Sequence, residues 1–160
     1  MNKSFVIELF YAEPAGTFTE GYVFRTAPDL TSAVDDPRNG YWHCNVTRDD
    51  RLMWSEKVYE LFGLPAGAPI EREWAVARYS EHSKEALERV RTFGLNREFG
   101  FILDAEITPE GGGDSWIRVL AVPIVASGRV VGLHGLKRAL MSPNVAIRRL
   151  LPNSRVRGVR

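Results

Sequence analysis

The stretch LMWSEKVYELFGLP, residues 52–65, indicates more about the fold than any other part of this sequence. Its first three residues complete the β-prone run RLMW, so we expect a strand that ends at Trp54. Ser55 follows as an N-cap, because a serine hydroxyl can accept a hydrogen bond from a free amide of the first helical turn. The apolar face of a short helix then appears at i, i+3 and i+4 spacing, at Val58, Leu61 and Phe62.

Gly63 and Pro65 predict where this helix ends. Glycine readily adopts the left-handed conformation that closes a helix, and proline cannot donate the backbone hydrogen bond that a further turn requires. The stretch therefore predicts a corner at which a strand passes into a two-turn helix.

Further strands and helices are predicted on both sides of this corner. GYWHCNV (40–46) is expected to form a hairpin with RLMW through the polar turn TRDD. A short helix over 71–79 and a longer one from Ser83 to about Gly94 come next. Three strands follow, at 99–108, 115–125 and 129–137. Helices flanked by antiparallel strands predict an α+β domain with one sheet covered by helices on one face.

Residues 1–37 form a separate opening segment. SFVIELFY (4–11) fits either a strand or a helical turn. The stretch TAPDLTSAVDDPRNG (26–40) is rich in turn-forming residues and predicts a linker.

Apolar and polar residues alternate in the strand expected at 99–108. The apolar face comprises Phe99, Phe101, Leu103, Ala105 and Ile107. Pairing of Thr108 with Trp116 on the next strand sets one candidate register. In that register Glu106 lies opposite Arg118, a structural charge pair worth about 0.2–1 kcal/mol.

The charge of the chain is unevenly distributed. Residues 137–160 contain seven Lys and Arg and no acidic residue, whereas residues 1–136 carry a net charge of −6. A basic C-terminal tail over 141–160 can contact nucleic acid or an acidic partner, and it can equally be a solvated end that offsets an acidic body.

Composition narrows the class of protein. No apolar run approaches the roughly 18 residues of a membrane span, and the N-terminus lacks a signal-peptide core. The single Cys44 excludes an internal disulfide and fits a reducing compartment. We therefore expect a cytoplasmic protein without a membrane partner.

The sequence offers little for catalysis or metal binding. His43, His82 and His134 fall in three separate elements without metal-ligand spacing, and no HExxH, GxSxG or GxxxxGK motif occurs. We expect no enzyme activity, no catalytic residue and no metal site.

The order of these elements resembles a PAS domain, of the subgroup whose first strand reads Gly-aliphatic-Trp-x-Trp-Asp. GYWHCNV is similar to that strand, and LMWSEKVYELFGLP to the second strand, first helix and Gly-Leu-Pro stop. YSEHSKEALERV (79–90) stands where the family has its longest helix, and residues 104–140 resemble its final three-strand meander. The resemblance covers roughly 38–140.

The resemblance implies a five-stranded antiparallel sheet with short helices over one face and a pocket between them. It also implies a sensory or interaction module that does no chemistry, and that dimerises through the outer sheet face and the flanking segment 1–37. We expect such a module to be a homodimer that regulates a partner signalling protein.

Several positions depart from the family pattern. Cys44 replaces the second strand Trp, which either opens a cavity or is compensated by neighbours. The usual Asp-aliphatic-Thr ending and signalling helix are missing, so a complete chain would act in trans. Haem and flavin are not expected, because Cys44 lies outside the flavin-binding motif and His82 precedes the helix that carries the haem ligand.

The candidate ligand-cavity residues are core-facing and mostly aromatic: Trp42, Cys44, Trp54, Phe62, Trp74, Tyr79, Phe101, Leu103 and Leu120, with Trp116 as a further aromatic residue. Such residues line a pocket for a small apolar ligand or fill the core outright, and the sequence leaves both open.

Three functions remain at this point. The first is a stand-alone PAS sensory module that regulates a partner in trans, with or without a small ligand in its core. The second is a small nucleic-acid-binding regulator that uses the basic tail, recognisable by salt-sensitive binding that is lost on deletion of 141–160. The third is a small-molecule enzyme on the same α+β scaffold.

Overall fold

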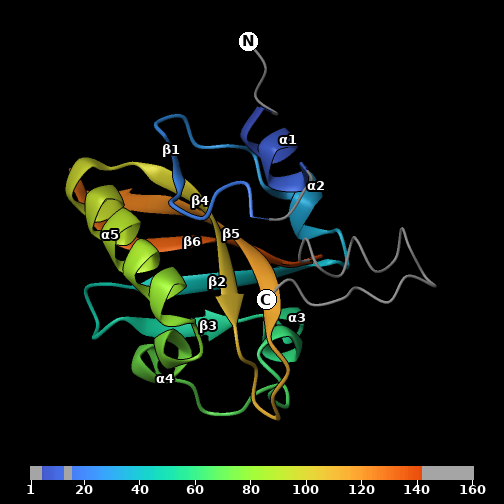
Figure 1. Cartoon of the computed structure of the whole chain (residues 1–160). Coiled ribbons are helices and arrows are strands. Elements are labelled where there is room, and N and C mark those ends of the chain that lie inside the picture. The colour runs from blue at the N-terminus through green and yellow to red at the C-terminus, as the bar shows by residue number, and fades with distance from the viewer. Residues whose placement is uncertain (1–4, 13–15, 142–160) are drawn as a thin grey trace.

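A computed structural model describes residues 5–12 and 16–141 of the chain (Figure 1). The elements in chain order are α1 (Phe5–Tyr11), β1 (Tyr22–Phe24), α2 (Thr31–Val34), β2 (Asn39–Asn45), β3 (Arg51–Trp54), α3 (Glu56–Leu61), α4 (Arg72–Ala77), α5 (Glu81–Arg97), β4 (Gly100–Ile107), β5 (Ser115–Ala126) and β6 (Arg129–Leu140). No helix among the described residues is both long and apolar enough to cross a membrane.

The described strands form one antiparallel sheet in the order β1-β4-β5-β6-β2-β3. This confirms the α+β class and the five predicted strands. The sixth strand, β1, pairs with β4 along Tyr22–Phe24. Three residues are too few to show a strand periodicity, so this strand was not predicted.

Both faces of the sheet are covered. The inner face packs against α3, α4 and α5 around a cluster that includes Val58, Phe62 and Leu87. The outer face packs against α1 and α2, with Phe10 and Ala33 against the sheet, and Phe24 at the end of the edge strand β1 belongs to the same cluster. Figure 1 shows α1 and α2 together at one end of the molecule and α3 and α4 at the other.

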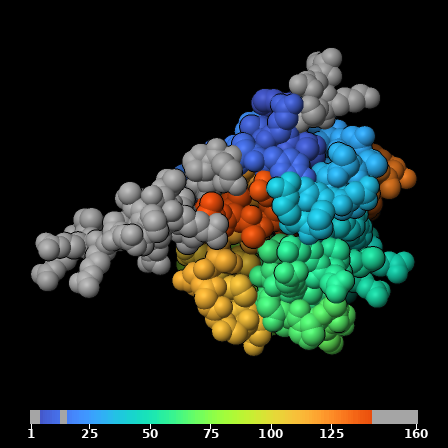
Figure 2. All heavy atoms as spheres, turned by 90° about the vertical axis from the view of Figure 1, so that its right-hand side faces the viewer, coloured from blue at the N-terminus to red at the C-terminus, as the bar shows by residue number. Residues whose placement is uncertain are grey.

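The opening segment is therefore part of the folded unit. Residues Phe5–Tyr11 form the helix α1, and part of the predicted linker forms α2, whose Ala33 is buried. In the space-filling view the blue N-terminal residues pack directly against the start of β2 and lie close to the end of β6 (Figure 2).

The predicted corner at 52–65 is present, with one difference in mechanism. Ser55 occupies the N-cap position of α3, but its hydroxyl makes no capping bond and instead accepts from the Tyr41 amide at 2.8 Å. The ring of Phe62 is fully buried and stacks on Trp54 at 4.8 Å between centroids. The serine thus joins β2 to the start of α3, a tertiary contact that the local sequence does not reveal.

Gly63 ends α3 in the left-handed conformation, at φ +74. A Cβ at this position would lie 2.3 Å from the Glu110 carbonyl oxygen, whereas a Cβ at Gly67, at φ +81, meets nothing within 4 Å. We expect Gly67→Ala to cost about 1 kcal/mol from backbone strain alone, and Gly63→Ala to cost about 2–4 kcal/mol because the β4–β5 loop must also move. Urea denaturation of both variants measures the difference, and equal losses would contradict the close approach.

Two predictions for β4 are corrected by the structure. The strand begins at Gly100, and Phe99 lies before it with its ring stacked on Phe93. The register differs by two residues, because Glu106 lies opposite Trp116 and Asp104 lies opposite Arg118. The ion pair is therefore Asp104–Arg118, and the coverage of the outer face buries it completely. Helix α5 also extends beyond its predicted bounds at both ends.

The buried ion pair holds the opening segment on the sheet. The Arg118 guanidinium donates to both Asp104 carboxylate oxygens, at 2.6 and 2.8 Å. It also donates to the carbonyl oxygens of Leu9, at 3.1 Å, and Ala12, while the Arg138 guanidinium donates to Phe10 at 3.2 Å. These donors satisfy carbonyl groups at the end of α1 that have no partner within the helix.

Candidate functional site

Lys137 lies on the inner face of β6, in the core of the domain, and only 7% of its surface is exposed. Its Nζ lies over four aromatic rings, at 4.9–5.9 Å from the ring centroids of Trp42, Trp54, Phe62 and Tyr79. Such ring faces attract a cation. Two aromatic residues of the stretch 52–65, Trp54 and Phe62, therefore lie against a basic group.

The polar environment of Lys137 is sparse. Among the described residues, its Nζ has one hydrogen bond, to the Tyr79 hydroxyl at 3.3 Å. Burial lowers the pKa of Lys137 from 10.5 to about 7, and burial raises the pKa of Tyr79. Near neutral pH the amine therefore gains or loses a proton readily, while the phenol remains neutral.

A small cavity, the inner cavity, lies beside Lys137 between the sheet and helices α4 and α5. Its volume is about 60 Å³. Aromatic and aliphatic side chains form most of its wall, and its cationic residues are Lys137, Arg72 and Arg91. No Asp or Glu of the described chain is among its lining residues. The cavity is thus apolar with a positive side.

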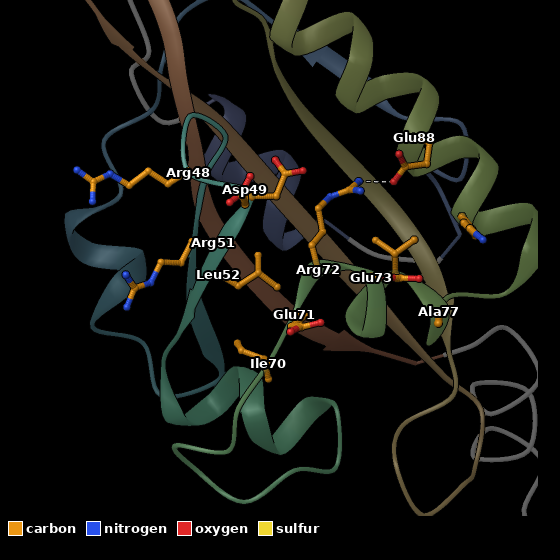
Figure 3. A pocket seen from close by; sticks show the side chains of 13 residues that line it. Arg48, Asp49, Arg51, Leu52, Ile70, Glu71, Arg72, Glu73, Ala77 and Glu88 are labelled. Carbon is orange, nitrogen blue, oxygen red and sulfur yellow. Dashed lines mark hydrogen bonds and ion pairs between the residues drawn. The ribbon is translucent and has the colours of Figure 1, made fainter.

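An open cleft of about 1020 Å³, the outer cleft, lies next to the inner cavity and shares Leu52, Arg72 and Val76 with it. Figure 3 shows Arg72, at the start of α4, extending toward Glu88 on α5, with which it forms an ion pair. Arg91 on α5 pairs with Asp50 of the β2–β3 turn at 2.7 Å. The two ion pairs connect three elements at the boundary between cleft and cavity.

The nine predicted cavity residues divide into three groups. Five line the inner cavity: Trp42, Cys44, Trp54, Tyr79 and Phe101. Three pack in the same inner cluster away from the cavity wall: Phe62, Leu103 and the partly buried Trp74.

Leu120 is misplaced in the prediction. Its side chain belongs to the outer cluster, because Ile117, Val119 and Ala121 of β5 face inward and the even-numbered residues face outward. Trp116 shares this outward alternation and belongs to neither cluster. Only the backbone of Leu120 reaches the site, where its carbonyl accepts from the Trp42 indole at 3.2 Å. Both faces of β5 are buried and both carry apolar residues. The sequence therefore could not show which face lines the inner cavity.

Cys44 lines the inner cavity as a buried, protonated thiol. Desolvation raises its pKa, and the nearby Asp50 carboxylate raises it further. A thiol with a raised pKa is a poor nucleophile. The small Cys44 side chain forms part of the cavity wall.

Sequence reasoning missed the cationic residues of the site. Lys137 was counted with the basic tail, and Arg72 and Arg91 were not singled out. The alternation of β6 places Lys137 on the same face as Leu133, which was the available signal. That signal is weak, because only the tertiary structure shows that helices cover the face of β6 on which Lys137 lies.

The histidines belong to three separate elements, as the sequence predicts, but the sheet brings two of them, His43 and His134, side by side. His134 is half-buried with its Nδ1 3.1 Å from the Tyr41 hydroxyl, and it lies opposite His43 across β2 and β6. The expectation that His82 precedes the longest helix is wrong, because α5 begins at Glu81 and His82 is exposed in its first turn. Within the described residues, no group of three or more His, Cys, Asp or Glu is placed to hold a metal ion.

The inner cavity does not fit a haem or a flavin. Pockets that enclose ligands of that size have volumes of roughly 300 Å³ or more, several times the 60 Å³ found beside Lys137. The four rings and the lysine fill the remaining space between sheet and helices.

No protein-family model and no curated protein sequence matches the chain. Solved structures do match. A sensory box histidine kinase/response regulator from Burkholderia thailandensis superimposes with a TM-score of 0.62 at 13% identity, over 77% of this chain and 92% of that one. The N-terminal domain of a diguanylate cyclase with PAS/PAC sensor from Marinobacter aquaeolei gives 0.58 at 17% identity, over 63% and 94%.

A PAS domain of a Colwellia psychrerythraea protein gives a TM-score of 0.56 at 15% identity, over 69% of this chain and 92% of that one. Superpositions at identities this low establish the fold alone. Membership of the subgroup with a Gly-x-Trp-x-Trp-Asp first strand stays a prediction. The six-stranded sheet, the helices over its inner face and these superpositions together show that the chain has the PAS fold.

Proposed function

We propose that this chain is a sensory signalling module that binds a small molecule in its inner cavity and regulates a partner protein in trans. The observation that carries the proposal is the buried Lys137 beside an unfilled apolar space. A buried amine with one hydrogen bond costs stability, and such costs are retained mainly where function requires them. The role is one of binding, without catalysis.

The ion pairs at the cavity boundary suggest how binding is transmitted. Arg72–Glu88 joins α4 to α5, and Arg91–Asp50 joins α5 to the β2–β3 turn. A ligand that contacts either arginine changes the relative free energies of the arrangements of these elements. A partner that recognises the surface of α4 and α5 then senses occupancy of the cavity.

The homodimer remains a proposal, and the structure changes how it would form. The helices α1 and α2 cover the outer sheet face, which the resemblance assigned to the dimer. A dimer that keeps this arrangement uses the outside of that segment, where Phe5 is 51% exposed. Deletion of residues 1–37 is a poor test, since it uncovers buried Ile102 and Leu136.

The proposed function predicts that freshly purified protein binds small molecules that fit about 60 Å³. Native mass spectrometry is expected to show a retained small mass or an added one after incubation with a fragment set, together with the oligomeric state. Thermal denaturation is expected to shift upward with the same fragments, because a ligand that binds only the native state stabilises it. If no fragment changes either measurement, the sensory proposal fails.

The nucleic-acid alternative depends on the tail at 141–160, of which residues 142–160 lie outside the described structure. Two of the seven basic residues counted over 137–160 belong to β6 and not to the tail. Lys137 contacts Tyr79 in the core, and Arg138 contacts the Phe10 carbonyl of α1. Five arginines remain in the tail. This alternative stays a prediction.

A further inference from the structure

The lining of the inner cavity carries an excess of positive charge. Lys137, Arg72 and Arg91 all contribute to its wall. The carboxylates that pair with the two arginines, Glu88 and Asp50, line the outer cleft and are not among the lining residues of the inner cavity. Arg72 and Arg91 already have these carboxylate partners, so an anion in the cavity would pair first with Lys137, for which no ion pair is found among the described residues.

Lys137 has hydrogen-bonding capacity to spare. An ammonium group has three donors, and within the described chain only the Tyr79 hydroxyl accepts from this one. The other neighbours within reach of Nζ are ring faces, which attract a cation but accept no conventional hydrogen bond. A carboxylate oxygen would supply the missing acceptors and form the stronger, charge-assisted bond.

The size and polarity of the remaining wall limit the ligand further. A space of about 60 Å³ matches roughly four to six non-hydrogen atoms. Leu87, Val119 and Leu133 supply aliphatic surface to the cavity wall, and Val119 lies beside Lys137 as its partner across β5 and β6. These residues suit a short hydrocarbon chain, and no Asp or Glu of the cavity lining could pair with a cationic group of the ligand.

We propose that the inner cavity is a binding site for a short-chain monocarboxylate whose carboxylate pairs with the Lys137 ammonium. Such a ligand has about three to five non-hydrogen atoms in addition to its carboxylate carbon. This inference rests on the proposed function, because it names the chemical class of ligand that the sensory cavity takes. The outer cleft supplies the route, since Arg72 lines both spaces.

Binding is expected to be coupled to a proton. A carboxylate beside Nζ favours the ammonium, so complex formation takes up a proton at pH values where the free amine is neutral. Because the pKa of Lys137 is about 7 in the free protein, the apparent affinity for a carboxylate is expected to fall about tenfold per pH unit above pH 7. The other charged groups that line the cavity are Arg72 and Arg91, and its other titratable groups, the Cys44 thiol and the Tyr79 phenol, are neutral near pH 7 because burial raises the pKa of both.

The test is isothermal titration of the full chain with sodium butyrate, and with butyramide as the uncharged analogue, at pH 7, 8 and 9. At pH 8 the titration is repeated in phosphate and in Tris, whose different ionisation enthalpies reveal proton uptake. Butyrate is expected to bind with close to one proton taken up and with the stated decline in affinity. Butyramide is expected to bind at least about tenfold more weakly at pH 7.

Two lysine variants make the assignment specific. Lys137→Met removes the ammonium while keeping an apolar chain of similar length, and it is expected to lose butyrate binding by about thirtyfold or more. Lys84→Met makes the same change in the outer cleft, away from the inner cavity, and is expected to bind as the original protein does.

Butyrate binding that survives Lys137→Met, or that is independent of pH, overturns the assignment. If butyramide or another uncharged fragment binds and butyrate does not, the carboxylate inference fails while the small-molecule sensor proposal stands. If no small molecule of either kind binds, both fail. A short aldehyde provides a further test. If its affinity rises with pH and borohydride traps an adduct on Lys137, the site forms imines with carbonyl compounds and the carboxylate inference is overturned.

Discussion

Asp104→Asn is expected to lower the free energy of unfolding by about 3–5 kcal/mol, because it leaves the Arg118 guanidinium buried without its counter-ion. Both side chains are completely inaccessible to solvent. The same guanidinium donates to the Leu9 and Ala12 carbonyls at the end of α1. The loss of stability should therefore be accompanied by partial release of the N-terminal segment from the sheet. Limited proteolysis detects this release as faster cleavage within the segment that precedes β1.

Urea denaturation with a matched control measures this effect. Glu60→Gln removes one partner of the exposed Lys57–Glu60 pair, which is separated by 3.2 Å, and is expected to change stability by less than about 1 kcal/mol. The double variant Asp104→Leu with Arg118→Met is expected to recover part of the loss, since it leaves no buried charge. A cost for Asp104→Asn no greater than that of Glu60→Gln would show that the pair does not hold the two layers together.

Lys137→Met is expected to stabilise the protein at pH 7 by about 1–4 kcal/mol, because it replaces a buried amine by an apolar chain of similar size. In the original protein the pKa of Lys137 is lowered from 10.5 to about 7. Between these pH values the unfolded chain binds one proton more than the native one. Stability therefore increases with pH in this window, by about 2 kcal/mol from pH 7 to pH 9.

Lys137→Met should lack this increase in stability between pH 7 and pH 9. Below pH 7 the amine is charged in both states and its burial costs most. Above about pH 10 the raised pKa of Tyr79 acts in the opposite direction, because the unfolded phenol loses its proton first. Urea denaturation at pH 7, 8 and 9 compares the two proteins, with Lys84→Met as the control. Parallel pH profiles for the original protein and Lys137→Met would contradict a depressed pKa at Lys137.

The sequence predicted most of the inner layer. The β2–β3 hairpin, the α3 corner and the final meander have local signatures in turn residues and apolar periodicity, and all three are present in the structure. Five of the nine proposed cavity residues line the inner cavity. The prediction was weakest in the opening segment and at Leu120, where apolar residues occur on both faces of the sheet.

What the sequence alone determined is the order of the elements from β2 to β6, because strand alternation, helix caps and glycine stops act between residues close in the chain; the resemblance of that order to PAS domains then implied the fold. Only the tertiary structure decided that Lys137 lies among Trp42, Trp54, Phe62 and Tyr79, and that Asp104 pairs with Arg118. Both arrangements join residues far apart in sequence, and in both the burial that makes a charge significant exists only after the layers have packed.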